Sequence, residues 1–295
     1  MRKYFIIIPI LILVYFLSDK DNSSIKIENK RIETDNLIVN MSNYGLENIL
    51  LSEYLNGVIA CEMPALFHDE AIKAGIVAAR TFYLYKYESD NDYKPSNGDQ
   101  CFFSESKRKE NWRDNYELYN EKILNNINLT KNEVITYNGS VIKAFYFSMS
   151  NGYTEDAVNV FKKSEPYLVS VISDYDKNVK NNLSSKSISV NEFKEKLNVD
   201  NDIVINNIVR DSSNRVSEIV INNVNYDGVY FRKLFDLRST DFEIEFNDQE
   251  VIITTRGYGH GVGMSQWGAN EMAKMGYEYK DILKYYYKDV EIMYK

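Results

Sequence analysis

Apolar and polar positions along the chain alternate with the period of a helix in three stretches. The first is 50–62 and the second 69–87, and in both the apolar residues recur every three or four positions. Pro64 separates these stretches, because its ring cannot continue a helix, and Asp69 is a suitable N-cap for the second. A weaker stripe over 109–125 predicts a third helix.

The period then shortens to two, which is typical of strands. Residues 134–137 and 140–147 flank Asn138-Gly139, a pair that favours a tight hairpin turn because both positions need a positive φ. Further along, the pattern predicts strands at 203–210, 216–221, 242–246 and 251–255, helices at 190–197 and 227–234, and two closing helices after a glycine-rich segment.

Together these patterns predict an α+β domain that spans 38–295, with mixed helices and mostly antiparallel strands. Residues 181–202 are polar, and we expect about 181–250 to form a smaller inserted or mobile lobe. Ahead of the domain, 21–37 has little apolar periodicity and is predicted to be a polar tether.

The first 20 residues have the pattern of an export signal. Arg2 and Lys3 precede an unbroken apolar run over 5–17, after which the sequence turns abruptly polar. This run suits a signal-peptide core and is short for a membrane span, but no A-x-A-like cleavage site follows it. We therefore expect an uncleaved anchor, with everything beyond about residue 20 outside the cytoplasm. A buried N-terminal helix or strand is the alternative.

Composition narrows the classes of partner. The 295 residues carry a net charge of −8, which disfavours binding to nucleic acid, because that requires a basic surface. The 24 tyrosines suit contact with sugar faces, although an AT-rich genome also enriches tyrosine. Cys61 and Cys101 are too few for a disulfide scaffold and leave the redox compartment open. With only two histidines, metal-hydrolase motifs such as HExxH are excluded.

Glu62 is the first candidate for chemistry. It lies four residues after Val58 and seven after Leu55, so it extends the apolar stripe of the first helix. A carboxyl group on the core-facing side of a helix end is partly desolvated, which should raise its pKa and keep it protonated near neutral pH, as a general acid requires. The alternative is a glutamate at a frayed helix end that swings into water.

Lys73 and Arg80 are the second candidates. Seven residues put them on nearly the same face of the second helix, whose small residues allow close packing. Arg80 could hold a carboxylate in a bidentate manner, either a lactyl group or Glu62 itself. The alternative is a pair of solvated cations on an ordinary amphipathic helix.

Glycine alternates with larger residues over 256–264, and Ser265 and Gln266 follow. If this segment is extended, one face has no side chains and His260 lies on the other, so another group can approach closely. The segment is neither GxGxxG nor a P-loop, which gives phosphate binding little support. Close packing against a neighbouring element, with Ser265 capping the next helix, competes with a functional role for His260 or Gln266.

The segment 146–155 leaves a predicted strand for a polar turn, where binding groups are common. Nothing like GxSxG surrounds its serines, which argues against a nucleophilic serine.

Four blocks of the sequence, in this order, resemble the stage II sporulation protein D family over about 38–292. They are 58–64 (VIACEMP), 71–81 (AIKAGIVAART), 145–152 (FYFSMSNG) and 257–268 (GYGHGVGMSQWG). The resemblance implies a lytic transglycosylase that cleaves peptidoglycan strands between N-acetylmuramic acid and N-acetylglucosamine during forespore engulfment, after a partner amidase has removed the stem peptides. It also implies a place in the mother-cell membrane, with the catalytic domain facing the intermembrane space.

Carried onto matching positions, the resemblance makes Glu62 the catalytic acid. The substrate-binding candidates, from the resemblance and from the glycine-rich segment, are Lys73, Arg80, Tyr146, Ser148, Ser150, Tyr175, His260 and Gln266. Asn151 stands where the family usually has glycine, so this turn can differ. Relatives with a metal beside the site leave zinc open, with Cys101 and His260 as the ligands that this chain offers, but no cofactor is required.

The residues favour a lyase over an ordinary glycosidase in one respect. No second carboxylate in a recognisable motif lies beside Glu62, and the usual hydrolytic route needs two. A lytic transglycosylase uses one acid to protonate the leaving oxygen and lets the muramic 6-hydroxyl close an anhydro ring. Amidase enhancers share these blocks, so a non-catalytic protein that binds glycan and activates an amidase is the alternative.

Overall fold

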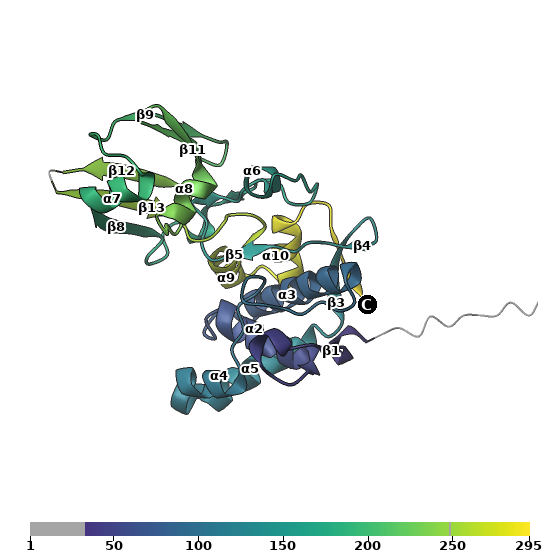
Figure 1. Ribbon diagram of the computed structural model, residues 1–295. Helices are drawn as coiled ribbons and strands as arrows, with labels where there is room; N and C mark the ends of the chain where they lie inside the picture. Colours follow the sequence, from purple (N-terminus) through teal and green to yellow (C-terminus); the bar gives the residue numbers. More distant parts are fainter. Residues whose placement is uncertain (1–32, 248) are drawn as a thin grey trace, which may run out of the picture. The chain divides into compact units, whose positions relative to one another are not determined.

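The computed structural model describes residues 33–247 and 249–295 (Figure 1). They belong to one unit with an α+β fold and mostly antiparallel strands, as the sequence predicts. The predicted anchor at 1–20, and the tether as far as residue 32, lie outside the described residues. In the described part of the chain, no helix combines the length and the apolar character needed to cross a membrane.

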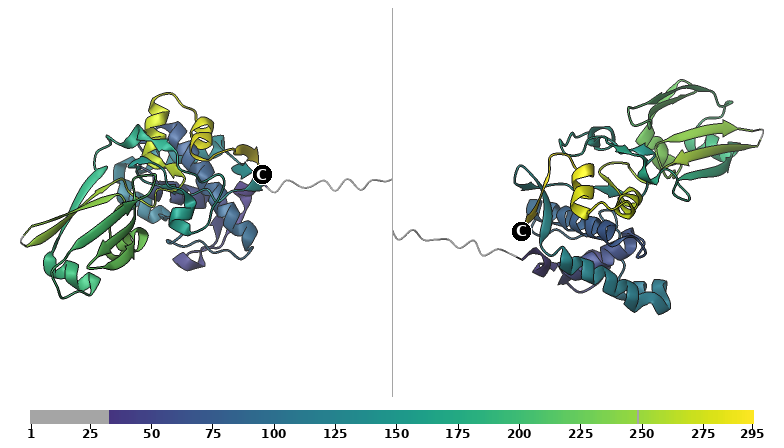
Figure 2. Two further views of the ribbon diagram at one scale, coloured as in Figure 1. Left: turned by 90° about the horizontal axis from the view of Figure 1, so that it is seen from above. Right: turned by 180° about the vertical axis from the view of Figure 1, so that it is seen from behind.

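The larger hydrophobic core is built around α3 (Asp69–Ser89). This helix packs against α2 (Leu51–Glu62), α5 (Tyr116–Leu129), α9 (Gln266–Lys274) and α10 (Tyr279–Tyr286). Alanine and glycine line its buried face, so the neighbouring helices come close to its backbone. Figures 1 and 2 show α9 and α10 on one side of α3, and α2 with α5 on the other.

Two helix boundaries differ from the sequence prediction. The N-cap of α3 is His68 and not Asp69, because the Nδ1 atom of His68 accepts the backbone N–H of Glu70 at 3.3 Å. The helix expected over 109–125 is wrong as a single element: α4 (Glu105–Trp112) and α5 are joined by a 3-10 turn (Arg113–Asn115). The positive φ of Arg113, 48°, ends α4.

The predicted hairpin is confirmed. Strand β3 (Glu133–Tyr137) pairs with β4 (Ser140–Val141). The φ values of Asn138 and Gly139, 48° and 75°, are those of a type I′ turn. The second strand is shorter than predicted, and β15 (Glu291–Tyr294), which was not predicted, pairs with the other edge of β3.

A second hydrophobic core lies within 188–253 and contains Phe193 and Phe231. Its strands and helices are β8 (Leu183–Ser189), α7 (Val190–Leu197), β9 (Ile205–Arg210), β10 (Val216–Ile221), β11 (Val224–Asp227), α8 (Gly228–Leu234), β12 (Phe242–Phe246) and β13 (Glu250–Arg256). The sheet orders are β12-β13-β8 and β11-β10-β9. The predicted strands and helices of this region are confirmed to within a few residues, whereas β8 and β11 were missed.

The glycine-rich segment before β14 (Met264–Ser265) is not extended, so the condition for one face without side chains is not met. All four of its glycines have positive φ, between 80° and 114°. The close packing that the glycines allow is confirmed, because a Cβ atom at Gly257 would lie 2.9 Å from the carbonyl oxygen of Met149. Strand β14 pairs in parallel with β5 (Tyr146–Phe147), and Ser265 caps α9 by accepting the N–H of Gly268 at 3.1 Å.

The remaining elements are short. They are β1 (Ile38–Val39), β2 (Ile49–Leu50), β6 (Gly152–Tyr153), α6 (Ala157–Phe161) and β7 (Ile172–Ser173), with 3-10 turns at Thr34–Asn36, Ser42–Tyr44 and Asp174–Asp176. The first two strands pair antiparallel, as do β6 and β7.

Candidate active site

Glu62 is the last residue of α2 and lines a cavity of about 430 Å³. The helical phase seen in the sequence explains this position, since the stripe that Glu62 extends is the buried face of α2. The other residues of the wall are aromatic, cationic or amide-bearing for the most part; they include Phe82, Lys86, Asp99, Gln100, Lys143, Phe145, Tyr146, Phe161 and His260. The cavity thus combines the half-buried Glu62 and Asp99 with aromatic rings and cations.

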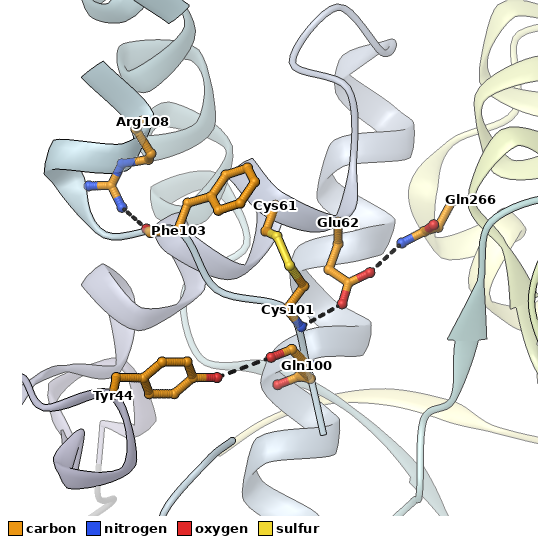
Figure 3. The surroundings of a disulfide bond; sticks show 8 residues. All are labelled: Tyr44, Cys61, Glu62, Gln100, Cys101, Phe103, Arg108 and Gln266. Carbon is orange, nitrogen blue, oxygen red and sulfur yellow. Dashed lines mark hydrogen bonds between the residues drawn. A yellow bond between two sulfur atoms is a disulfide. The ribbon is translucent and has the colours of Figure 1, made fainter. Parts of the chain in front are cut away.

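Two donors hold the Glu62 carboxyl group in place. Its Oε1 atom accepts the backbone N–H of Cys101 at 2.7 Å, and the side-chain amide of Gln266 lies 3.5 Å from Oε2 (Figure 3). Burial raises the pKa of Glu62, and the hydrogen bonds from Cys101 and Gln266 offset this only in part. The group is therefore suited to carry a proton at a higher pH than an exposed glutamate.

Cys61 and Cys101 form a disulfide bond, which fixes the loop that contacts Glu62 (Figure 3). The bond joins α2 to a segment 40 residues further on. The backbone N–H of Phe103 adds a hydrogen bond of 3.0 Å to the carbonyl of Gly57. The disulfide pairs the only two cysteines of the chain, and it positions the backbone donor of Glu62.

The suggestion of Cys101 as a metal ligand is wrong, because a disulfide sulfur is not the thiolate that zinc requires. His260 does not replace it: its Nδ1 atom accepts the backbone N–H of Val262 at 3.0 Å. Within the described ranges, no three His, Cys, Asp or Glu side chains form a group that could hold a metal ion. The residues present do not fit zinc, and we derive no step from it.

His260 is packed among the rings of Phe145, Phe147 and Phe161, at centroid distances of 5.6, 6.0 and 5.6 Å. Burial lowers the pKa of His260 to about 3, and the charges of Arg232 and Arg215 act in the same direction. The imidazole is neutral near pH 7, so it shapes the cavity wall and does not exchange protons there.

Tyr146 and Gln100 form the wall beside Glu62. The side-chain amide of Gln100 donates to the hydroxyl oxygen of Tyr146 at 2.9 Å, and the hydroxyl of Tyr54 donates to Oε1 of Gln100 at 3.3 Å. Burial raises the pKa of Tyr146 well above its ordinary value, and the charge of Glu62 adds to this. The Tyr146 hydroxyl therefore stays protonated and can donate a hydrogen bond.

Asp99 is a second carboxylate in the wall of the same cavity, although no motif revealed it. Lys86 pairs with it at 3.0 Å, and the hydroxyl of Ser96 donates to it at 2.8 Å. Burial alone would raise the pKa of Asp99, but the hydrogen bonds from Lys86 and Ser96 outweigh this and lower it. The pKa values of the two carboxyl groups thus differ more than usual: Glu62 favours the protonated acid and Asp99 favours the anion.

Arg80 and Lys73 lie apart from the cavity lining. Arg80 is fully buried and pairs with Asp35 through Nε at 2.5 Å and Nη2 at 2.9 Å, while Nη1 donates to the carbonyl of Glu133 at 3.2 Å. Its bidentate partner is therefore Asp35 and not Glu62. Lys73 is half-buried and pairs with Glu70 at 2.6 Å. Both cations are occupied within the fold, which differs from the solvated pair that the sequence also allowed.

Three further candidates have distinct surroundings. Ser150 is buried, and its hydroxyl bonds to Asp176 at 2.7 Å and to the carbonyl of Ser173, so it holds the turn after β5. The carbonyl of Ser148 accepts the N–H of Trp267 at 3.1 Å, which places it at the start of α9. Tyr175 packs against the rings of Tyr277 and Tyr285.

Comparisons with known proteins point to one family. The family profile described as "Stage II sporulation protein" matches residues 42–137, which include Glu62 and Cys101. The stage II sporulation protein D of Bacillus amyloliquefaciens is 40% identical over 262 residues, which cover 85% of this chain and 76% of that protein. The protein of the same name from Bacillus subtilis is 38% identical with the same coverage. The amidase enhancer of Bacillus subtilis is 29% identical over 79% of this chain and 39% of its own length.

Proposed function

The chain belongs to the stage II sporulation protein D family, and on this premise we propose that it is a peptidoglycan lytic transglycosylase of sporulation. Its substrate is a glycan strand without stem peptides, cut between N-acetylmuramic acid and N-acetylglucosamine. One observation carries the proposal. Glu62 lies in a cavity with aromatic and cationic walls, and burial raises its pKa as a general acid requires.

In the proposed reaction, the protonated Glu62 gives its proton to the glycosidic oxygen while the bond from that oxygen to C1 of N-acetylmuramic acid breaks. The carboxylate then accepts the proton of the 6-hydroxyl of the same sugar, and O6 bonds to C1. One product ends in a 1,6-anhydro ring and the other in a free 4-hydroxyl. Glu62 is protonated again at the end, so a single acid completes the cycle.

The neighbouring residues support this role. The Cys101 N–H and the Gln266 amide stabilise the carboxylate formed after the first proton transfer. Asp99 supports the rival hydrolytic route, which needs a second carboxylate to activate water. We assign Asp99 a positioning role, because Lys86 and Ser96 occupy its oxygens.

The test is digestion of purified denuded glycan strands by the full chain in water enriched in ¹⁸O, followed by mass spectrometry. We expect 1,6-anhydromuramic ends without ¹⁸O. Glu62→Gln should lose at least about 100-fold in rate, since general acid catalysis contributes this much or more. Reducing ends labelled with ¹⁸O would show a hydrolase, and unchanged products from Glu62→Gln would overturn the role of Glu62.

A second function is favoured by the resemblance to an amidase enhancer: binding to glycan without turnover, so that an amidase acts faster. In this case Glu62→Gln would accelerate the release of stem peptides by a sporulation amidase as well as the natural chain does, and neither would form anhydro ends. For either function we propose membrane attachment through the apolar run at 5–17 and work beside an amidase during engulfment, on the mother-cell membrane.

A further inference from the structure

Lys143 lies in the segment between β4 and β5 and lines the cavity that contains Glu62. Its ammonium group is 4.8 Å from the ring centroid of Phe145 and 5.8 Å from that of Phe161. These two rings are stacked with centroids 4.5 Å apart, and both belong to the cavity wall. The cation is therefore held over an aromatic surface that faces the site of the proposed chemistry.

The charge of Lys143 is not balanced inside the protein. Among residues 33–247 and 249–295, Lys143 forms no ion pair, whereas the other cavity lysine, Lys86, is paired with Asp99 at 3.0 Å. The acid whose charge acts on Lys143, Glu165, is itself paired with Lys163 at 3.0 Å. Burial lowers the pKa of Lys143, and the charge of Lys86 lowers it further. A half-buried cation of this kind gains most from a ligand that carries an anion.

We propose that Lys143 binds a carboxylate of the glycan strand, the ether-linked lactyl carboxylate of N-acetylmuramic acid. This inference rests on the proposed function and deepens it, because it names a residue that recognises the state of the strand. A strand without stem peptides carries a free carboxylate at every lactyl group. In a peptide-bearing strand the same carbon is part of a neutral amide, which offers Lys143 no charge.

The cavity is suited to this selection. The ring of Phe161 is 38% exposed and can receive the apolar face of the sugar, while the ammonium group over Phe145 meets the carboxylate. Asp99 is kept anionic and is paired with Lys86 at 3.0 Å, so this pair offers an incoming carboxylate no net positive charge. Lys143 therefore selects strands with a charged lactyl group, and it also sets the orientation of the muramic residue in the cavity.

Binding measured in the Glu62→Gln background tests the inference without turnover. The ligands are denuded glycan oligosaccharides and the same oligosaccharides with their lactyl carboxylates converted to methylamides. We expect Lys143→Met to weaken binding of the carboxylate form by about 10- to 100-fold, as for a hydrogen bond between charged groups, and to leave binding of the methylamide form unchanged. The loss should shrink as salt concentration rises.

Lys288→Met is the matched control, since its ammonium group also lies over an aromatic ring, that of Tyr285 at 5.3 Å, but it does not line this cavity. Added to the Glu62→Gln chain, Lys288→Met should leave the affinity for both ligands unchanged. An equal loss for the carboxylate and methylamide forms, or no loss, would overturn the role of Lys143.

The two proposals fail separately. If the natural chain forms no anhydro ends, the lyase assignment fails. The affinities for the carboxylate and methylamide ligands still decide whether Lys143 binds the carboxylate. If anhydro ends form and Lys143→Met leaves KM for denuded strands unchanged, only the inference about Lys143 fails.

Discussion

The burial that raises the pKa of Glu62 also lowers the stability of the fold when Glu62 is ionised. Because burial raises its pKa, the folded chain prefers the protonated form, and unfolding becomes easier as the pH rises above the ordinary value of 4.5. Gln keeps the shape and the hydrogen-bond acceptor but has no charge to desolvate. We predict that Glu62→Gln is at least as stable as the natural chain at pH 5 and more stable at pH 8.

Thermal unfolding of both chains at the two pH values checks this. Glu117→Gln, which changes an exposed glutamate on α5, is the control and should show no such difference between pH 5 and pH 8. A Gln variant that is less stable at pH 8 would mean that the carboxylate stabilises the fold, contrary to the argument from burial.

His260 predicts the opposite dependence on pH. Burial lowers its pKa to about 3, so the folded chain excludes a proton that the unfolded chain accepts below about pH 6.5. Stability should therefore fall as the pH decreases from about 6.5 towards 3. His260→Gln should reduce this acid sensitivity, and it should leave the pH profile of kcat/KM between pH 6 and 9 unchanged in shape, since the imidazole stays neutral there.

Urea unfolding at pH 7 and pH 4.5 measures the first effect, and initial rates across pH 6 to 9 measure the second. His68→Gln, at the exposed N-cap of α3, is the comparison histidine. If His260→Gln removed a rise or fall from the pH profile of kcat/KM, His260 would be shown to exchange a proton during turnover.

At the scale of elements, the join between α2 and the segment 99–103 controls the site. The disulfide, the Phe103–Gly57 hydrogen bond and the Cys101–Glu62 hydrogen bond all reach α2 within residues 57–62. We predict that Cys61→Ala with Cys101→Ala lowers the free energy of unfolding by about 2–4 kcal/mol, as expected for a loop of this length. Activity should fall too, because the backbone donor of Glu62 is released.

Gly57→Ala should push the segment 99–103 away from α2 while the disulfide stays intact. An added Cβ atom would lie 2.7 Å from the carbonyl oxygen of Phe103, so we expect a loss of about 1–3 kcal/mol and reduced activity. Denaturant unfolding and the anhydro-product assay, with and without a dithiol reductant, compare the variants. Full activity in both would show that the placement of the segment does not matter to Glu62.

The elements differ in how well the sequence predicts them, for physical reasons. The type I′ turn follows from the local pair Asn138-Gly139, and the buried face of α2 follows from the apolar stripe within the helix itself. In contrast, the break at Arg113 contains neither glycine nor proline, and β8 has mostly polar residues that become a strand only because β13 pairs with them. Such features depend on partners distant in the sequence.

The same limit applies to the candidate site. Glu62 could be found because it continues a local periodicity, and Gln266 because it follows an unusual glycine pattern. Asp99 and Gln100 lie in a stretch without periodicity, and Lys143 lies in a predicted strand whose pattern does not single it out, so all three reach the cavity only through the fold. The pairing of Arg80 with Asp35 was also not predictable, because the two are 45 residues apart.

At the scale of the whole molecule, buried polar contacts join the two hydrophobic cores. Arg215, just before β10, donates to the carbonyl of Tyr153 at 3.0 Å and to the hydroxyl of Ser213 at 3.0 Å. The Ser213 hydroxyl in turn donates to Glu155 at 2.5 Å, and Arg215 lies 3.9 Å from Glu155. Burial raises the pKa of Glu155, although its hydrogen bonds to Ser213 and Asn159 and the charge of Arg215 counteract this.

Removal of Arg215 should therefore uncouple the cores. Arg215→Ala leaves Glu155 buried without its cation, which costs about 3–5 kcal/mol. Because Glu155 can escape the penalty by taking up a proton, the loss should be smaller at pH 5 than at pH 8. We predict that calorimetric unfolding of Arg215→Ala separates into two transitions at pH 8, one for each core, and that the natural chain unfolds in one.

The double variant with Glu155→Gln decides whether charge is the cause. The substituted amide has no charge to leave unpaired, so the double variant should recover a large part of the stability that Arg215→Ala loses at pH 8, and little at pH 5. If the double variant is instead as unstable as the single one at both pH values, the cores are joined by the packing and backbone contacts of Arg215, and the ion pair with Glu155 contributes nothing measurable.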